Sequence, residues 1–315
     1  MGNKVFIGID TSNYTTSLAA VTTDGEVIAN LKAPLPVADG ERGLRQSDAV
    51  FAHVKNLPSL CESLREIIKG SEIVAVGYSY APRDCEGSYM PCFLVGETAA
   101  HSFACASDVP IYKFSHQAGH VRAAIHSSSM PTKSGDEFVA FHVSGGTTEV
   151  LYVKVMEDRY EIEKLGGTSD ISAGQAIDRI GVMLGMHFPA GRELEAAALE
   201  YSGKTEKAKL SVNGTACNLS GLENMAKKMM NNGESRQKIA AFTLDFVGRT
   251  LLRLTDAATE VYPDTRVLYS GGVMSNSIIK NMLRTDKRYF AEPQLSADNA
   301  VGTALLTKDR HTAQK

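Results

Sequence analysis

Cysteine is scarce in this sequence, and its positions exclude two kinds of framework. Five cysteines occur in 315 residues, and no two of them stand in a C-x-x-C pair. An odd number of widely spaced cysteines fits neither a disulfide scaffold nor a zinc knuckle. The pattern therefore predicts reduced thiols in a cytoplasmic protein. The five residues are Cys61, Cys85, Cys92, Cys105 and Cys217.

The sequence also lacks long apolar runs and an excess of basic residues. No apolar run approaches the ~20 residues that a membrane-spanning helix needs. Met1 leads directly into an expected strand over residues 5–9, where a signal peptide would place a longer apolar segment. The formal net charge of −3 argues against a protein that coats nucleic acid on its own. We therefore expect a soluble cytoplasmic protein with no membrane contact, which would bind nucleic acid through a local patch or a basic partner.

Expected strands alternate with expected helices, which predicts an α/β architecture. Strands over 5–9, 17–22 and 26–30 form an antiparallel meander, with a hairpin signal at Asp24-Gly25. Strands over 138–143 and 149–154 repeat this theme, and we interpret the repetition as an internal duplication. The expected helices cover 47–69, 94–106, 171–186, 221–231 and 234–262.

A polar, turn-rich segment over residues 127–136 separates the two repeated units. The length suits one large or two medium domains. The sequence therefore predicts an N-terminal domain over residues 1–130 and a C-terminal domain over residues 131–315.

Three turns at strand ends are rich in glycine or hydroxyl side chains: residues 10–16, 144–148 and 270–276. Small residues let the backbone approach a ligand closely, and a helix N-terminus favours anions. Taken singly, each is more often just a tight turn. Their repetition favours a cleft in which the first two turns meet phosphates and the third faces a nucleoside.

His116 and His120 stand four residues apart, so on a helix they project from one face. Asp298 opens another helix-like run and would complete a set of two histidines and one carboxylate, which leaves coordination positions open for Lewis-acid chemistry. A bare H-x-x-x-H pattern is weak, since many such pairs are core or surface histidines. The other histidines read as structural or solvent-exposed: His53, His101, His126, His142, His187 and His311.

With these motifs the chain resembles the TsaD family, also called Gcp and once described as O-sialoglycoprotein endopeptidases. The resemblance runs from residue 8 to about residue 306. It implies a two-domain actin-like ATPase fold of the sugar kinase and chaperone ATPase superfamily, with a nucleotide cleft between duplicated domains. The blocks that carry it are residues 8–12, 116–120, 143–148, 173–178, 188–195, 219–222, 270–276 and 297–299.

The resemblance also implies an activity: transfer of a threonylcarbamoyl group from threonylcarbamoyl-AMP to an adenosine of tRNA. It implies one divalent metal ion on His116, His120 and Asp298, with Fe or Zn favoured and Mn compatible. It implies an adenine nucleotide (threonylcarbamoyl-AMP, ATP or ADP), and tRNA bound through an assembly with accessory protein subunits.

Family site residues map onto matching positions of this chain. Asp178 matches a ribose contact; read without the family, it is a polar residue of an amphipathic helix. In the same way Glu195 reads as an exposed helix charge and Asn276 as a helix N-cap. The matched nucleotide contacts are His142, Val143, Ser144, Gly145, Gly146, Asp178, Gly191, Glu195, Gly271, Gly272 and Asn276, and the matched catalytic positions are Asp10, Thr11 and Ser12.

The chain departs from the family pattern at four places. Residues 13–15 carry no carboxylate where the family has an acidic pair. Gln117-Ala118 stands in place of Met-Glu between the two histidines, and Thr147 stands in place of the histidine that follows Ser-Gly-Gly. A segment that is usually Gly-Pro-Gly-rich is longer and charged over residues 81–91. If the missing groups assist proton transfer, their loss costs about 10²-fold in rate.

These departures indicate a divergent paralog and leave alternatives to the transferase open. One is a nucleotide- and metal-binding regulator without transfer activity, and another is a small-molecule kinase of the same superfamily. A zinc protease is disfavoured, because the H-x-x-x-H segment lacks the glutamate beside its first histidine.

Overall fold

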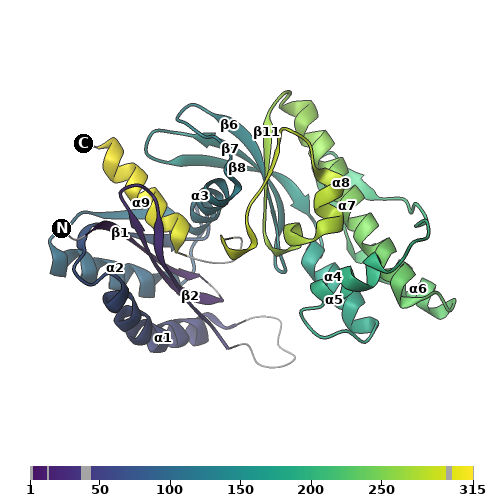
Figure 1. The fold of residues 1–315 in the computed structure, drawn as a ribbon, viewed down its shortest axis with the longest axis horizontal. Helices are drawn as coiled ribbons and strands as arrows, with labels where there is room; N and C mark the ends of the chain where they lie inside the picture. Colours follow the sequence, from purple (N-terminus) through teal and green to yellow (C-terminus); the bar gives the residue numbers. More distant parts are fainter. Residues whose placement is uncertain (1–2, 13, 37–43, 296–299, 315) are drawn as a thin grey trace.

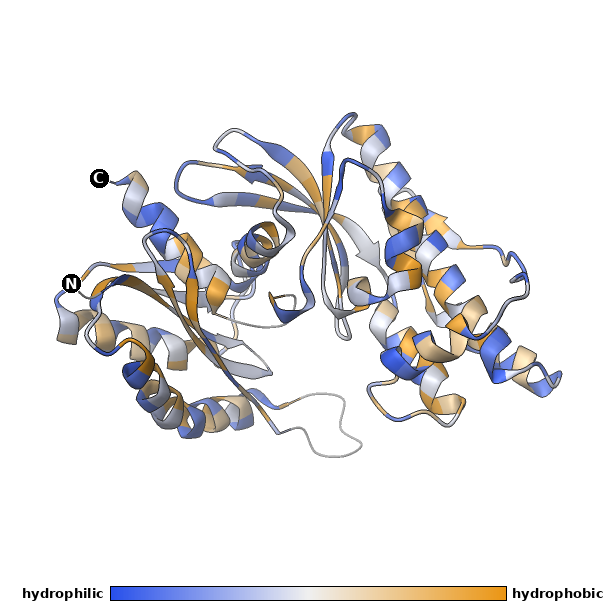
Figure 2. Cartoon of the chain, viewed as in Figure 1, coloured by the Kyte–Doolittle hydropathy of each residue, from blue (hydrophilic) through white to orange (hydrophobic). Residues whose placement is uncertain are grey.

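A computed structural model describes residues 3–12, 14–36, 44–295 and 300–314 of the chain. Two β-sheets each carry helices on their outer face, and two further helices lie between the sheets (Figure 1). Apolar residues concentrate along the strands and on the inward sides of the helices (Figure 2). The predicted α/β architecture is confirmed.

The first sheet has five strands, and helices cover both of its faces. Val5, Ile7 and Ile9 pack toward the outer helices, whereas Phe6 packs toward the last helix of the chain. Burial on both faces explains why these strands are apolar almost throughout. The strand order is β3 (Val27–Pro34), β2 (Thr15–Thr22), β1 (Lys4–Ser12), β4 (Glu72–Ala81) and β5 (Ile111–Ser115), and the outer helices are α1 (Gln46–Ile67) and α2 (Phe93–Ser107).

The second sheet has seven strands, and five of them repeat the first sheet. In each sheet an antiparallel meander of three strands lies next to two parallel strands, in the same spatial order. This shared topology confirms the duplication expected from the sequence. The order is β12 (Arg288–Phe290), β11 (Arg266–Ser270), β6 (Glu137–Val143), β7 (Thr148–Val155), β8 (Tyr160–Thr168), β10 (Ala216–Asn218) and β9 (Ser211–Asn213).

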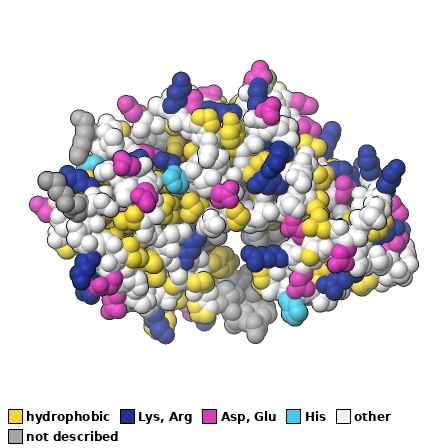
Figure 3. Space-filling model, in the orientation of Figure 1, with side chains coloured by type: hydrophobic (Ala, Val, Ile, Leu, Met, Phe, Trp, Pro, Cys, Tyr) yellow, Lys and Arg dark blue, Asp and Glu magenta, His cyan; other side chains and the backbone are white. Residues whose placement is uncertain are grey.

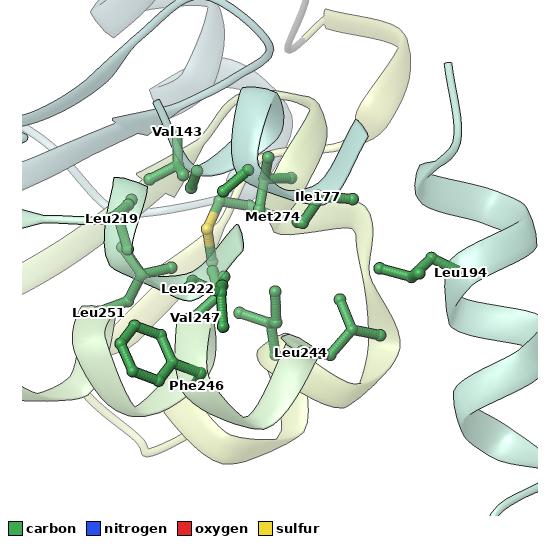
Figure 4. Packing of buried hydrophobic residues seen from close by; sticks show 14 of the residues in the cluster. Val143, Ile177, Leu194, Leu219, Leu222, Leu244, Phe246, Val247, Leu251 and Met274 are labelled. Atoms are coloured by element: carbon green, nitrogen blue, oxygen red, sulfur yellow. The ribbon is translucent and has the colours of Figure 1, made fainter. Parts of the chain in front are cut away.

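The outer face of the second sheet carries the largest apolar core. Val143 and Met274 pack there against Leu244 and Val247 of the long helix α7 (Figure 4). The elements on this side are α4 (Ala173–Met183), α5 (Gly191–Leu199), α6 (Ser220–Asn231), α7 (Arg236–Val261), the short 3-10 helix η1 (Gly272–Ser275) and α8 (Ser277–Leu283).

Helices α3 (His116–Ser128) and α9 (Val301–Ala313) form the layer between the sheets. Val121 and Ile125 of α3 pack on the second sheet, and Val301 and Leu305 of α9 pack on the first. The end of the chain therefore returns to the strands with which it began (Figure 1). The boundary expected near residue 130 falls between the two sheets and stays a prediction.

Glycines allow α9 to approach its neighbours at backbone distance. A Cβ on Gly302 would lie 1.8 Å from the carbonyl oxygen of Gly119 in α3. One on Gly77 would lie 1.8 Å from Thr307 Oγ1, and one on Gly8 would lie 2.3 Å from the carbonyl oxygen of Ala300. Side chains larger than hydrogen at these three positions would push α9 away from α3 and the first sheet.

Several elements differ from the expectation. Strand β1 runs through Ser12, which pairs with Thr15, so Asp10, Thr11 and Ser12 lie in a strand and the expected polar turn is shorter. Strand β8 and helix α5 were not expected, and the helix expected over 171–186 ends at Met183. No helix among the described residues is both long and apolar enough to cross a membrane.

We predict that Gly302→Ala lowers the free energy of unfolding by about 1–3 kcal/mol, because the added methyl overlaps the Gly119 carbonyl. Urea denaturation of the purified protein measures this. Gly221→Ala is the matched control, since a Cβ there meets nothing within 4 Å and α6 gains a better helix former. An unfolding free energy of Gly302→Ala equal to that of the wild type would contradict the close packing of α9.

The burial of His53 in α1 predicts that the stability of the protein depends on pH. Its ring is fully buried, its Nδ1 lies 2.8 Å from Thr16 Oγ1, and burial lowers its pKa below 6.5. The unfolded chain therefore binds a proton more readily, so the stability present above pH 6.5 is lost as the pH falls below that value. Urea midpoints at pH 7.5 and pH 5.5 should show a contribution from His53 of up to about 1.4 kcal/mol per pH unit. His53→Gln should reduce the slope by this amount, and His126, whose pKa burial also lowers, keeps its own contribution. An unchanged slope in the variant would count against this assignment.

Candidate active site

A cleft of about 530 Å³ opens between the two halves of the molecule. Figure 3 shows the surface hollowed there. Helix α3 and strand β6 contribute to its lining, as do the ends of the first two strands. Of the predicted site residues within the described ranges, the cleft is lined by Ser12, His116, His120, His142, Ser144, Gly145, Gly146 and Gly272.

The histidine pair lies at the start of α3. Ser115 caps this helix, its hydroxyl accepting from the Ala118 amide at 3.2 Å, so the helix begins at His116. His120 follows one turn later, and the two Nε2 atoms lie 2.9 Å apart. The predicted facing of the two imidazoles is confirmed.

Asp10 contacts the ring nitrogen of His116 that faces away from His120. Its Oδ1 lies 3.0 Å from His116 Nδ1, and its side chain is buried at the end of β1. The tautomer that donates Nδ1–H to Asp10 leaves the lone pair of Nε2 directed at His120. A carboxylate in this position orients a metal-bound histidine and raises its basicity.

This donor set fits a metal ion. Metal–nitrogen distances of ~2.0–2.1 Å place two neighbouring ligands of one cation about as far apart as the two Nε2 atoms are. The third predicted ligand, Asp298, lies outside the described residues. Among the residues that are described, no group of three or more histidine, cysteine or acidic side chains could hold a metal. The complete three-ligand site stays a prediction.

A third imidazole, that of His142, lies next to the pair. Its ring centroid is 4.7 Å from that of His120, and its Nδ1 is 3.3 Å from Ser270 Oγ. It stands at the end of β6, directly before the glycine turn. The cleft therefore brings together three imidazoles from two elements.

The turn over residues 144–148 presents backbone to the cleft. Gly145 and Gly146 are exposed and line it, while Ser172 donates from its hydroxyl to the Gly145 carbonyl at 2.7 Å. The Ala173 amide, at the start of α4, donates to Thr148 Oγ1 at 2.9 Å. A phosphate in the cleft would therefore meet the turn rather than the α4 N-terminus. Val143 does not line the cleft, and its side chain is buried in the core.

The turn after β11 requires glycine. Gly271 has φ 98°, and a Cβ there would lie 2.2 Å from the Val143 carbonyl oxygen. Gly272 lines the cleft. Asn276 caps α8, its Oδ1 accepting from the Ile279 amide at 3.1 Å, which confirms its reading as an N-cap.

Three other predicted nucleotide contacts lie among α4, α5 and α8 and do not line this cleft: Asp178, Gly191 and Glu195. Asp178 accepts from the Ala190 amide at 2.8 Å, and burial raises the pKa of its carboxyl. Glu195 accepts from the Ser277 amide at 2.7 Å, so it is more than an exposed helix charge. Their contact with a nucleotide stays a prediction.

Thr11 holds helix α2. Its hydroxyl donates to the Cys92 carbonyl at 2.9 Å and accepts from the Gly96 amide at 3.0 Å. It is fully buried and does not line the cleft, whereas its neighbour Ser12 does. The catalytic roles of Asp10, Thr11 and Ser12 stay predictions. Their hydrogen bonds give Asp10 an orienting role and Thr11 a packing role.

Sequence reasoning missed a charged group in the cleft. Glu149 of β7 binds the guanidinium of Arg83, the ammonium of Lys164 at 2.9 Å and, at 3.4 Å, the side-chain amide of Gln117. A lone acidic residue in the otherwise apolar run 148–153 is a signal that could have found it. Arg83 belongs to the charged segment that departs from the family pattern.

The chain is similar to known proteins along most of its length. Residues 37–305 match the family profile of tRNA N6-adenosine threonylcarbamoyltransferase. Relatives of that name from Methanopyrus kandleri and Streptococcus sanguinis are 29% and 30% identical, over 94% and 95% of this chain and 85% and 90% of their own.

A ROK family glucokinase from Streptomyces griseus, solved in complex with glucose and AMPPNP, shares the fold with a TM-score of 0.53 at 10% identity, over 96% of this chain and 99% of its own. That likeness confirms the expected actin-like ATPase fold. Because the family profile covers most of the sequence, from the segment before α1 into α9, the chain belongs to the TsaD family of tRNA N6-adenosine threonylcarbamoyltransferases.

Proposed function

We propose that this chain transfers a threonylcarbamoyl group from threonylcarbamoyl-AMP to the exocyclic amine of an adenosine in tRNA, with one divalent metal ion. The observation that carries the proposal is the pair of imidazole nitrogens 2.9 Å apart, backed by Asp10 and lying in one cleft with an exposed glycine turn. Family membership supplies the reaction, and the cleft supplies a place for the donor.

His116, His120 and the predicted ligand Asp298 would hold the metal, and imidazole with carboxylate suits Fe or Zn. Bound there, the ion would polarise a carbonyl of the transferred group. Asp10 would keep His116 in the tautomer that ligates. The chain's own contribution is to place the donor beside this pair.

In the reaction the adenosine nitrogen forms a bond to the carbamoyl carbon, the bond from that carbon to the phosphate oxygen breaks, and AMP leaves. The amine loses one proton. The backbone of Gly145 and Gly146 would stabilise charge on the departing phosphate, and the cleft walls would hold the reactants in line. The adenosine would enter from a single-stranded loop, where a base can be splayed out.

The tRNA needs a partner in this proposal. A net charge of −3 provides no broad phosphate-binding surface, so we propose that tRNA binds through an assembly with accessory protein subunits, in the cytoplasm. The replaced family positions point to a slower reaction. Gln117 binds Glu149, Ala118 is buried, and neither offers a proton acceptor.

We predict that His116→Ala loses bound metal and transfer activity together, because one of the two facing nitrogens is removed. Elemental analysis and a tRNA modification assay on the same preparation measure both. His101→Ala, an exposed histidine of α2, is the control and should keep both. Stoichiometric metal in His116→Ala would overturn the site. Metal and nucleotide binding by the wild type without transfer would favour the regulatory alternative, and ATP-dependent phosphorylation would favour the kinase.

We predict that Asp10→Asn lowers metal affinity about 10- to 100-fold while leaving the fold intact, because a neutral amide orients His116 less firmly. Competition with a chromogenic chelator measures the affinity. Asp24→Asn in the turn after β2 is the matched control, since it changes the same charge away from the cleft. Equal affinities in the two variants would show that Asp10 does not support the metal site.

A further inference from the structure

One cationic side chain lines the described part of the cleft. Of the lining residues within the described ranges, Arg83 is the only lysine or arginine and Glu149 the only acidic residue. The remaining polar groups there are hydroxyls, imidazoles and amides. An anionic ligand group in this space therefore has Arg83 as its permanent cationic partner.

The segment that carries Arg83 is built onto the start of α3. The Gln117 amide donates to the Pro82 carbonyl at 3.0 Å, and Asp84 accepts from the Ser115 hydroxyl at 2.6 Å. The Arg83 amide donates to Ser88 Oγ at 3.0 Å. These contacts fix the backbone of Arg83 close to the start of α3, which carries the histidine pair.

The charges around Glu149 sum to one positive charge. Arg83 and Lys164 both contact one oxygen of its carboxylate, and that side chain is 9% exposed. The Arg83 side chain is 45% exposed, and Lys164 does not line the cleft. A guanidinium has five N–H donors, so Arg83 can bind Glu149 with some of them and a ligand with others.

We propose that Arg83 binds the carboxylate of the group that the enzyme transfers, an inference that rests on the proposed function. The donor carries two anionic groups, a phosphate and the α-carboxylate of threonine. The glycine turn of the second half is placed to meet the phosphate, whereas Arg83 stands in the first half, at the start of the histidine helix. The planar fork of arginine matches a carboxylate, and the contact with one oxygen of Glu149 leaves part of that fork free for a ligand.

The test compares wild type with Arg83→Gln, using three probes and ligand-detected NMR titration. N-Carbamoyl-L-threonine carries the carboxylate, its methyl ester lacks the charge, and AMP carries only the phosphate. We expect Arg83→Gln to lower the affinity for N-carbamoyl-L-threonine roughly 10- to 100-fold, the range for the loss of a charged hydrogen bond. Binding of the ester and of AMP should stay within about twofold.

Variants of the two other charged residues in this cluster, Lys164 and Glu149, serve as controls. Lys164→Gln removes the other cation on Glu149 outside the cleft lining, so it should leave all three probes unchanged. Glu149→Gln leaves more N–H groups of the guanidinium free, so the variant should bind N-carbamoyl-L-threonine several-fold more tightly. Weaker binding in Glu149→Gln would mean that the pair only shapes the cleft, and it would overturn the proposal.

Three further outcomes would overturn the proposal about Arg83. A loss of AMP affinity in Arg83→Gln would make Arg83 a phosphate ligand, and no change with any probe would make it a link between the two halves; either overturns the proposal. No binding of N-carbamoyl-L-threonine by the wild type overturns it as well. Failure of the wild type to bind AMP would count against the proposed function alone, because the carboxylate probe contains no nucleotide.

Discussion

The packing of α9 against α3 and the first sheet is the constraint on which the site depends. Gly8 and Gly302 have no room for a side chain because backbone atoms of the neighbouring element lie against them, and Gly77 has none because the side chain of Thr307 does. Arg122 of α3 adds a hydrogen bond to Asp309 of α9 at 2.6 Å. Ala300, directly before α9, lies against Gly8 of β1. Gly8 precedes Asp10 by two residues on that strand, so the start of α9 lies near the buried carboxylate of Asp10. The last helix and the first strand therefore meet at the histidine helix.

A second set of close contacts holds the glycine turn of the other half. Gly174 of α4 lies against Ser144 and Gly145, and a Cβ on it would come within 2.5 Å of both. Gly271 lies against Val143 in the same way. Backbone contacts on both sides leave the turn little freedom. In the proposed reaction, a turn held in this way would meet charge on the departing phosphate without reorganising.

Between these two walls lie the positions at which the chain departs from the family pattern. Positions that carry a glutamate and a histidine in the family pattern hold Ala118 and Thr147 here. A different acid, Glu149, lies in the cleft and is neutralised by Arg83 and Lys164. The segment over residues 81–91 is thus more than an insertion, because its contacts with the start of α3 aim a charged side chain across the cleft at the other half. The departures from the family pattern surround the histidine pair and leave the pair intact.

The sequence by itself determined the alternation of strands and helices and the spacing of the histidine pair, but not strand β8 or helix α5. Apolar runs, the Asp24-Gly25 turn and the i, i+4 spacing of His116 and His120 depend on local geometry, which a linear pattern records. The tertiary structure decided what lies behind and opposite them. Asp10 backs His116 across 106 positions, and Arg83 reaches Glu149 across 66. No local pattern encodes such contacts, because they arise only when two sheets and two central helices pack together.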